Sequence, residues 1–480
     1  MARRFSTLFL LLGLIPAVSG AAPASFKFGR LGTVPVVRPA GDPSQVAILF
    51  SSEHGFGARE AAMAQALAAA GALVFEVDTQ RYFATGSRST DTHFFPAAEF
   101  ETMSQIGQRE MGLTTYRQPI LVGTGAGAGV AYVALAQAPA NTFAGAVADN
   151  FCEVIPSHFR FRRGNHLSWD KTWPGPGIRV LPDAAIENPW VVFGTAGKTA
   201  CPVGPLSDFV KDIDAVQMIP PPAGVPPQDA WKKQLPQALT ILAAKHREEE
   251  AAQAARGELR DLPLNEIKAE GAEKDVLAVI VTGSGGYVGL DRKMGNQLSS
   301  RGVPVVGLSS LAYFWKPRNP DGTARDLTRI LDHYMAAWHK SRAIVIGYSQ
   351  GADVVPFMVD RMAPALRAKI GLVALIGPDG AAQFDLHPDG WISNRQQSPD
   401  LPVMPEIPKL KGNRVLCIYG AAEEKSLCKQ IAPKQASIIE VPGDHGFEGD
   451  APKLIERFLA EAGLAPTAPA APAKARKGGL

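Results

Sequence analysis

The 480-residue chain lacks the features that mark several classes of protein. Its 49 basic and 46 acidic residues leave a net charge of only +3, so no electrostatic footprint for nucleic acid is present. No apolar run after residue 22 approaches the roughly 18 residues that a membrane-spanning helix needs. The phosphate-binding pattern G-x-x-x-x-G-K-[ST] is absent, which argues against a nucleotide site. We therefore expect no nucleic-acid partner, no cofactor and no metal.

Cysteine is scarce, with four residues in the whole chain. Four cysteines allow three pairings, and spacing alone does not choose strictly among them. The spacing favours Cys417–Cys428 and Cys152–Cys201, one bridge in each half of the chain. Buried free thiols are the alternative. Disulfides would fit a protein that works in an oxidising compartment.

The N-terminus has the order of a secretory signal peptide. Arg3 and Arg4 precede an apolar run over 5–18, and small residues follow at 19–22. The run is short for a membrane span, although an uncleaved membrane anchor remains the alternative. We expect residues 1–22 to be removed and the mature protein to work outside the cytoplasm.

The remaining chain contains an internal repeat. An apolar run leads into Gly-Phe at 55–56, and another leads into Gly-Tyr at 286–287, an offset of 231 residues. The same offset relates Tyr-Phe at 82–83 to Tyr-Phe at 313–314. A gapless match of landmarks over this distance indicates a duplication, which decides the domain organisation.

Each copy alternates short apolar runs with helical patterns. The runs lack clean alternation, as expected of strands buried on both faces of a parallel sheet. The fold class predicted is therefore α/β, with two tandem α/β-hydrolase-like doubly wound parallel-sheet domains of which the first is a degenerate copy. The predicted strands are 46–50, 72–77, 119–122, 145–149, 190–193 and 215–219, then 276–281, 303–306, 343–347, 372–377, 414–419 and 437–441. The predicted segments are a signal peptide (1–22), a first domain (23–225), a helical linker (226–260), a second domain (261–465) and a disordered tail (466–480).

The second copy contains the pattern G-x-S-x-G at 347–351, where an apolar run meets a helix-competent run. This is the pattern of a nucleophile elbow, a strand-to-helix turn so tight that small residues must flank the serine. It predicts Ser349 as a catalytic nucleophile. The pattern is weak alone in a chain with 47 glycines, so the rest of a catalytic set must be found.

The base and the acid should follow the nucleophile, each after a strand. His445 lies after the last predicted strand, between glycine-containing turns, and is the predicted base; His387 is a weaker rival. Glu423, three residues after the glycine that ends the preceding strand, is the predicted acid. The alternatives for the acid are Glu424, Asp385 and Asp379. A bridge between Cys417 and Cys428 would hold the loop that carries Glu423.

An oxyanion hole needs two backbone N–H groups beside the nucleophile. Gln350 should supply one, and Ser284 or Gly285, in the loop after the first strand of the copy, should supply the other. The first copy has Gly125 where the second has Ser349, so it cannot run this chemistry. We expect it to be a structural partner, a substrate-presenting surface or a docking module.

With these residues identified, the chain resembles the VirJ/AcvB family of bacterial periplasmic virulence proteins. The resemblance covers nearly the whole mature chain and is sharpest in the second copy. The matching motifs lie at 302–307 (GVPVVG), 313–315 (YFW), 347–349 (GYS), 351–354 (GADV), 417–420 (CIYG) and 445–450 (HGFEGD). The first-strand loop differs from the family pattern at Ser284 and Tyr287, and Gln350 stands where the family often has an aromatic residue.

The resemblance implies a periplasmic α/β-hydrolase that cleaves the aminoacyl ester of aminoacyl-phosphatidylglycerol, lysyl or alanyl, and so modulates envelope charge and virulence. It places the nucleophile on Ser349 and the histidine on His445. The chemistry of such an ester favours an acidic residue, Asp353 or Asp385, as the binding partner of its ammonium group; a structural role for either residue is the alternative. We expect Tyr287 at the mouth of the site. The expected partners are the lipid substrate at a membrane surface and a periplasmic protein bound through the first domain. Two alternatives stay open: a non-enzymatic adaptor of a secretion system, and an esterase acting on a soluble ester.

Overall fold

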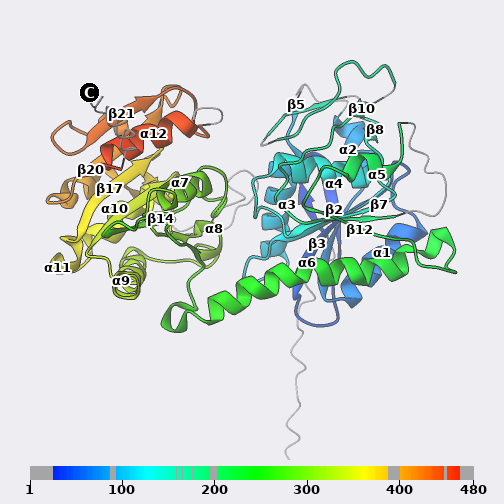
Figure 1. Ribbon diagram of the computed structural model, residues 1–480, viewed down its shortest axis with the longest axis horizontal. Coiled ribbons are helices and arrows are strands. Elements are labelled where there is room, and N and C mark those ends of the chain that lie inside the picture. The colour runs from blue at the N-terminus through cyan, green and yellow to red at the C-terminus, as the bar shows by residue number, and fades with distance from the viewer. Residues whose placement is uncertain are drawn as a thin grey trace, which may run out of the picture.

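The computed structural model describes residues 25–86, 93–157, 159–164, 166–175, 177–194, 203–386, 400–447 and 451–464. The predicted signal peptide and tail lie outside these residues, as do Cys201 and His387. Figure 1 shows two groups of strands side by side, the first blue to green and the second green to orange, each covered by helices. Within the described residues, no helix has both the length and the apolar character needed to cross a membrane.

The first domain is built on an eight-stranded sheet. Its strands from β4 to β12 run parallel, and β1 and β2 add an antiparallel extension at one edge. In spatial order the strands are β1 (Ser25–Phe28), β2 (Gly32–Val37), β4 (Ala72–Val77), β3 (Gln45–Phe50), β6 (Pro119–Thr124), β7 (Gly145–Asp149), β11 (Trp190–Phe193) and β12 (Val216–Ile219).

The second domain is built on a seven-stranded sheet with the same order of strands. Six strands run parallel, and β13 pairs antiparallel with β15 as β2 does with β4. In spatial order they are β13 (Leu264–Ile267), β15 (Val305–Leu308), β14 (Val276–Val281), β16 (Arg342–Tyr348), β17 (Ile370–Ile376), β20 (Val415–Gly420) and β21 (Ser437–Val441). The prediction of two tandem, doubly wound α/β domains is confirmed. The antiparallel edge strands β1, β2 and β13 were not predicted, since their short polar and apolar alternation does not stand out from a loop.

The duplication extends to individual hydrogen bonds. In the first copy the backbone N–H of Thr79 donates to Ser51 Oγ at 2.9 Å. In the second copy, 231 residues further on, the N–H of Ser310 donates to Thr282 Oγ1, also at 2.9 Å. Each contact joins the end of the first parallel strand to the helix after the second. The repeat seen in the sequence is therefore a repeat of local structure.

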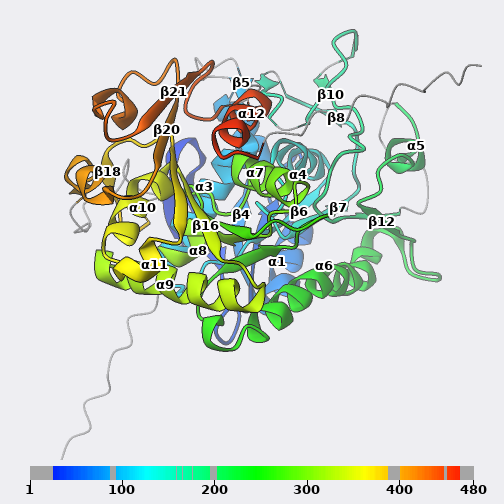
Figure 2. The ribbon, with the colours of Figure 1, turned by 60° about the vertical axis from the view of Figure 1, so that its left-hand side comes forward.

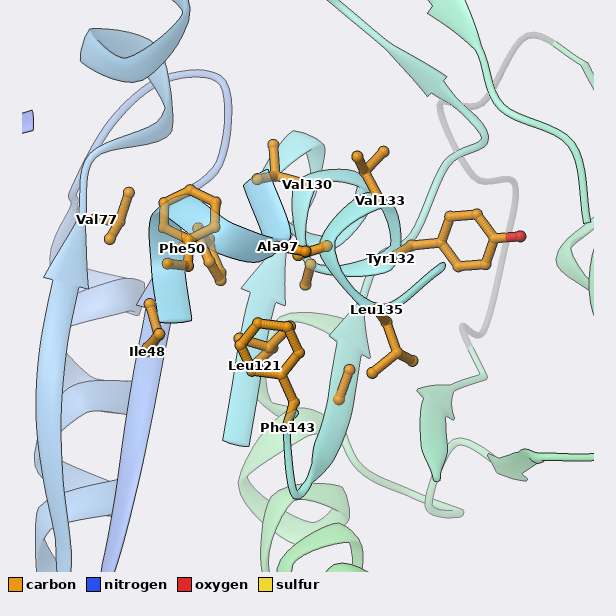
Figure 3. Packing of buried hydrophobic residues seen from close by; sticks show 14 of the residues in the cluster. Ile48, Phe50, Val77, Ala97, Leu121, Val130, Tyr132, Val133, Leu135 and Phe143 are labelled. Atoms are coloured by element: carbon orange, nitrogen blue, oxygen red, sulfur yellow. The ribbon is translucent and has the colours of Figure 1, made fainter. Parts of the chain in front are cut away.

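Helices cover both faces of each sheet. On the first sheet they are α1 (Ala58–Ala69), α2 (Thr79–Gly86), α3 (Pro96–Glu110), α4 (Ala126–Gln137), α5 (Leu206–Val210) and α6 (Trp231–Ala254), and on the second α7 (Gly289–Ser299), α8 (Ser310–Tyr313), α9 (Pro320–Ala337), α10 (Gln350–Asp360), α11 (Pro364–Arg367) and α12 (Ala451–Glu461). Helix α4 is buried on all sides, and Figure 3 shows side chains of α4 in the same apolar cluster as side chains of β3 and β6. The cores are thus apolar layers on either side of each sheet.

The helix expected in the linker is α6, which runs below the first sheet in both Figure 1 and Figure 2. Its first half is amphipathic, and Trp231, Leu235, Ala238, Leu239 and Leu242 pack with α1 and the strands of the first sheet. This part of α6 is therefore the last helix of the first domain, and the connection to the second sheet begins after it.

Candidate active site

The turn at Ser349 is an elbow between β16 and α10. Ser349 has φ 52° and ψ −120°, a conformation that L-residues rarely adopt. Added Cβ atoms at Gly347 and Gly351 would lie 2.4 Å from the carbonyl oxygen of Gly351 and 1.9 Å from that of Val281. Only glycine fits at either position, because the strand and the helix cross so closely. The tight crossing pushes the Ser349 side chain out at the carboxyl end of the sheet.

Three side chains from three loops form a hydrogen-bonded relay. His445 Nε2 lies 2.9 Å from Ser349 Oγ, and His445 Nδ1 lies 2.7 Å from Glu423 Oε1. The other oxygen of Glu423 accepts the backbone N–H of Gly420 at 2.5 Å, which fixes the carboxylate. The hydrogen bond to Glu423 raises the pKa of His445, against the opposing effect of burial. This is the geometry of a Ser-His-Glu triad.

Besides Glu423, the carboxylate of Asp379 lies close to His445. Asp379 is exposed, and one of its oxygens lies within 4.8 Å of ligand atoms of Glu423 and His445. The three side chains could in principle share a metal ion. A metal on His445 Nδ1 would, however, have to displace the 2.7 Å hydrogen bond to Glu423. The arrangement fits a triad better than a metal centre.

Asp353, on α10, lies behind the site rather than at its mouth. Its side chain accepts the backbone N–H of Gly380 at 2.8 Å and that of Asp379 at 3.4 Å. Burial raises the pKa of Asp353 to about 7, partly offset by the hydrogen bond from Gly380. Both oxygens of the Asp353 carboxylate therefore accept hydrogen bonds from the loop after β17, which differs from the role in binding a substrate ammonium group expected above.

The other acid alternatives lie in different surroundings. Glu424 is exposed next to Glu423, and the relay uses Glu423. Asp385 pairs with Arg109 of the first domain, 3.1 Å away, instead of with His445. Tyr287 is buried in the core, close against Gly295 and Gly307, so it does not line the mouth of the site. The placement of Tyr287 contradicts the expectation drawn from the loop, because its side chain turns under α7.

The loop predicted to supply an oxyanion-hole N–H group passes beside Ser349. An added Cβ at Gly283 would lie 3.5 Å from Ser349 Cβ, so the first-strand loop passes next to the nucleophile. Among the described residues, the N–H groups of Ser284, Gly285 and Gln350 donate no hydrogen bond within the protein. The loop is held from behind by Asp291, whose buried carboxyl accepts the Gly283 N–H at 3.3 Å.

Tyr348 is a contributor that sequence reasoning missed. Its hydroxyl donates to the backbone oxygen of His445 at 3.1 Å, and the two rings stack with centroids 6.0 Å apart. The aromatic residue before the nucleophile thus supports the histidine loop. The only signal in the sequence was a tyrosine at the variable position of G-x-S-x-G.

The first domain contains the same elbow in a blocked form. Gly125 has φ 53° and ψ −123°, and the N–H of Ala126 after it donates to Glu53 Oε2 at 3.0 Å. Ala126 corresponds to Gln350, and Glu53, by the offset of 231, to Ser284. The first domain therefore lacks a nucleophile and fills the position of an oxyanion with its own carboxylate.

One predicted disulfide is confirmed. Cys417 in β20 and Cys428 are bonded, with Cα atoms 5.6 Å apart, and Glu423 lies in the loop that they close. Cys152 is also disulfide-bonded, but the pairing with Cys201 falls on a residue outside the described part of the chain.

Comparisons with known proteins give one family and several distant structures. No sequence among the curated proteins is similar to the chain. Similar solved structures include Est1E from Butyrivibrio proteoclasticus (16% identity, TM-score 0.33, covering 42% of this chain and 94% of that one) and XC6422 from Xanthomonas campestris, described as an α/β serine hydrolase without a lid (17%, 0.28, 43% and 90%). A serine hydrolase homologue from Coxiella burnetii is similar at 16% identity and a TM-score of 0.28, covering 41% and 90%.

The sequence profile of the family described as "Bacterial virulence protein (VirJ)" matches residues 275–464. The match begins one residue before β14 and ends after α12, and it includes all three residues of the relay. The second domain of this chain is a VirJ-family domain.

Proposed function

We propose that the protein is a serine esterase that cleaves the aminoacyl ester of aminoacyl-phosphatidylglycerol, in its lysyl or alanyl form. The observation that carries the proposal is the relay of 2.9 Å and 2.7 Å joining Ser349, His445 and Glu423. The VirJ-family domain supports the substrate class through the resemblance described above. The basic and apolar order of residues 1–22 supports a periplasmic location.

In the first half-reaction Ser349 Oγ attacks the ester carbonyl carbon and passes its proton to His445 Nε2. Glu423 holds the imidazole in the tautomer that can accept this proton and stabilises the imidazolium. The tetrahedral intermediate collapses with loss of the glycerol oxygen, which takes the proton from His445. The amino acid is then bound to Ser349 as an ester.

In the second half-reaction a water molecule gives a proton to His445 and attacks the acyl-enzyme, releasing the amino acid and restoring Ser349. In both steps negative charge develops on the carbonyl oxygen. The N–H of Gln350, with that of Ser284 or Gly285, is free to stabilise that charge.

The charge around the relay suits a cationic acyl group. Asp379 is exposed beside His445, and it raises the pKa of His445 together with Glu423. The ammonium group of an aminoacyl ester would be attracted to this carboxylate and activates the adjacent carbonyl. Asp379, rather than the occupied Asp353, is our candidate for binding that ammonium group.

Vesicles containing lysyl- or alanyl-phosphatidylglycerol provide the test, with released amino acid as the readout. We expect release by the unmodified protein, loss of release with Ser349→Ala, and unchanged release with Ser207→Ala, an exposed serine on α5. Equal release by Ser349→Ala would overturn the nucleophile. No release from either lipid, together with cleavage of a soluble aminoacyl ester, would overturn the lipid substrate.

A further inference from the structure

The two domains meet through opposite ends of their parallel strands. Arg109, Leu113 and Tyr116 precede β6 and lie at the amino end of the first sheet. They contact Trp315 and Asp385, which follow β15 and β17 and lie at the carboxyl end of the second sheet. Ser349 lies at this same carboxyl end. The first domain thus lies over the carboxyl end of the second sheet, where Ser349 is. Its own blocked elbow is at the carboxyl end of the first sheet, away from this contact.

Trp315 is the centre of the contact. Its indole Nε1 donates to the backbone oxygen of Leu113 at 2.9 Å, and its ring lies 5.2 Å from that of Tyr116. The Arg109 guanidinium lies over the same ring, 5.0 Å from its centroid. Tyr116 packs against the apolar core of the second domain. Aromatic and arginine side chains that are largely buried are typical of the energetically important part of an interface.

Arg109 also forms an ion pair across the interface. Its Nη2 donates to Asp385 Oδ1 at 3.1 Å and to the backbone oxygen of Trp315 at 3.3 Å. The side chains of Arg109 and Asp385 are only 19% and 15% exposed, so the pair is shielded from solvent. Removing one partner of such a pair leaves the other charge buried without compensation.

The segment 377–386 connects this ion pair to the catalytic relay. An added Cβ at Gly377 would lie 3.2 Å from the His445 ring, so the segment starts against the base. Near its other end, the backbone oxygen of Gln383 accepts the side-chain amide of Gln350 at 3.1 Å. Asp385 follows two residues later. The segment therefore contacts the base and the residue after the nucleophile, and the first domain holds it through Asp385.

We propose that the first domain is a fixed cap that completes the active site of the second, and that Arg109 is a positioning residue that holds segment 377–386 through Asp385. The cap is supplied by the neighbouring copy of the duplicated fold. This inference rests on the proposed function only for the location of the site, since the placement of the segment can be measured without substrate.

A second interdomain pair provides a matched control. Arg292 Nη1 lies 2.5 Å from Glu187 Oε2, with side chains 31% and 53% exposed. Arg292 belongs to α7 and has no contact with segment 377–386 among the interactions of the described residues. Arg292→Ala removes an arginine and an interdomain ion pair but leaves the segment in place.

Hydrogen exchange of the full chain tests the placement directly. We expect Arg109→Ala to speed exchange of the Gly380 and Leu386 amides at least tenfold, and Arg292→Ala to leave them within twofold. Asp385→Asn should do the same as Arg109→Ala, and the double variant should add nothing to either single change. Unchanged exchange in Arg109→Ala, or equal effects of Arg109→Ala and Arg292→Ala, would overturn the proposal.

Reactivity separates positioning from general loss of structure. We expect Arg109→Ala to slow fluorophosphonate labelling of Ser349 and to lower kcat for a short soluble aminoacyl ester about tenfold, with KM within twofold and a cooperative melting transition retained. A fall in the melting temperature with no change in labelling or kcat would contradict a positioning role. If lipid is not cleaved but labelling depends on Arg109, the cap stands and the lipid substrate fails.

Discussion

Ser349 and Gly125 have the same backbone conformation, with φ and ψ of 52° and −120° in one domain and 53° and −123° in the other. The backbone N–H of each residue also donates to a carbonyl oxygen at the end of the next strand, that of Ile376 for Ser349 and that of Asp149 for Gly125. The duplicated fold has thus kept the turn in both copies and a nucleophile in one.

Returning a serine to the first elbow should not create a second active site. A Cβ at Gly125 would lie 2.7 Å from Glu53 Oε2, and that carboxylate already occupies the Ala126 N–H. We expect Gly125→Ser, in a Ser349→Ala background, to take no fluorophosphonate label and to lose about 1–3 kcal/mol of stability from the strained backbone. Labelling of residue 125, detected by peptide mass spectrometry, would contradict this reading of the first domain.

The strained turn at Ser349 should cost stability. Because φ is positive there, glycine fits the turn better than any L-residue. Ser349→Gly should therefore unfold about 2–4 °C above Ser349→Ala, a difference of about 1 kcal/mol, while both variants are inactive.

Ser300 provides the control for that comparison. It is exposed, with φ −62°, at the end of α7. At this position the alanine variant should be the more stable of the two. If the alanine variant melts at the higher temperature at both sites, the elbow is not strained.

Activity should depend on pH through His445. Its pKa is raised by the hydrogen bond to Glu423, and only the neutral imidazole can accept the Ser349 proton. kcat/KM should therefore fall as the pH drops through a value above 6.5. Glu423→Gln removes the negative charge, so the acid limb should move to lower pH while the plateau falls roughly 10³–10⁴-fold.

The pH profile needs one further variant, because Asp353 has a pKa of about 7 and titrates in the same range. The shift caused by Glu423→Gln should persist when Asp353→Asn is present in both proteins. If the acid limb instead disappears with Asp353→Asn alone, the base has been assigned to the wrong group.

The disulfide should support catalysis as well as folding. Cys417 and Cys428 close a short loop around Glu423, and a bridge of this separation is worth about 2–3 kcal/mol. Replacing both cysteines with alanine should lower the melting temperature and reduce kcat, because the loop that orients Glu423 loosens. A lower melting temperature with an unchanged kcat at 20 °C would limit the bridge to a structural role.

The relay was predictable because each residue follows a strand with a strong signal. Apolar runs at 343–347, 414–419 and 437–441 placed the three loops at one edge of a parallel sheet. Chain order then selected Ser349, Glu423 and His445. Local pattern and topology agree at these positions, so reasoning from the sequence succeeds there.

The interdomain contact could not be predicted in the same way. Arg109 and Asp385 are 276 residues apart, and nothing in either local pattern distinguishes them from surface charges. The prediction for Tyr287 was wrong for a related reason. Its position in a loop suggested the mouth of a site, but its ring fills a space beside two glycines in the core. Side-chain direction and domain packing are set by tertiary structure.

The most direct test is the identity of the residue that becomes covalently modified. After incubation of the full chain with a fluorophosphonate, peptide mass spectrometry should find one modified residue, Ser349, and His445→Ala should lower its labelling by several orders of magnitude. An unlabelled Ser349, or equal labelling in His445→Ala, would contradict the account of the second domain as a serine esterase.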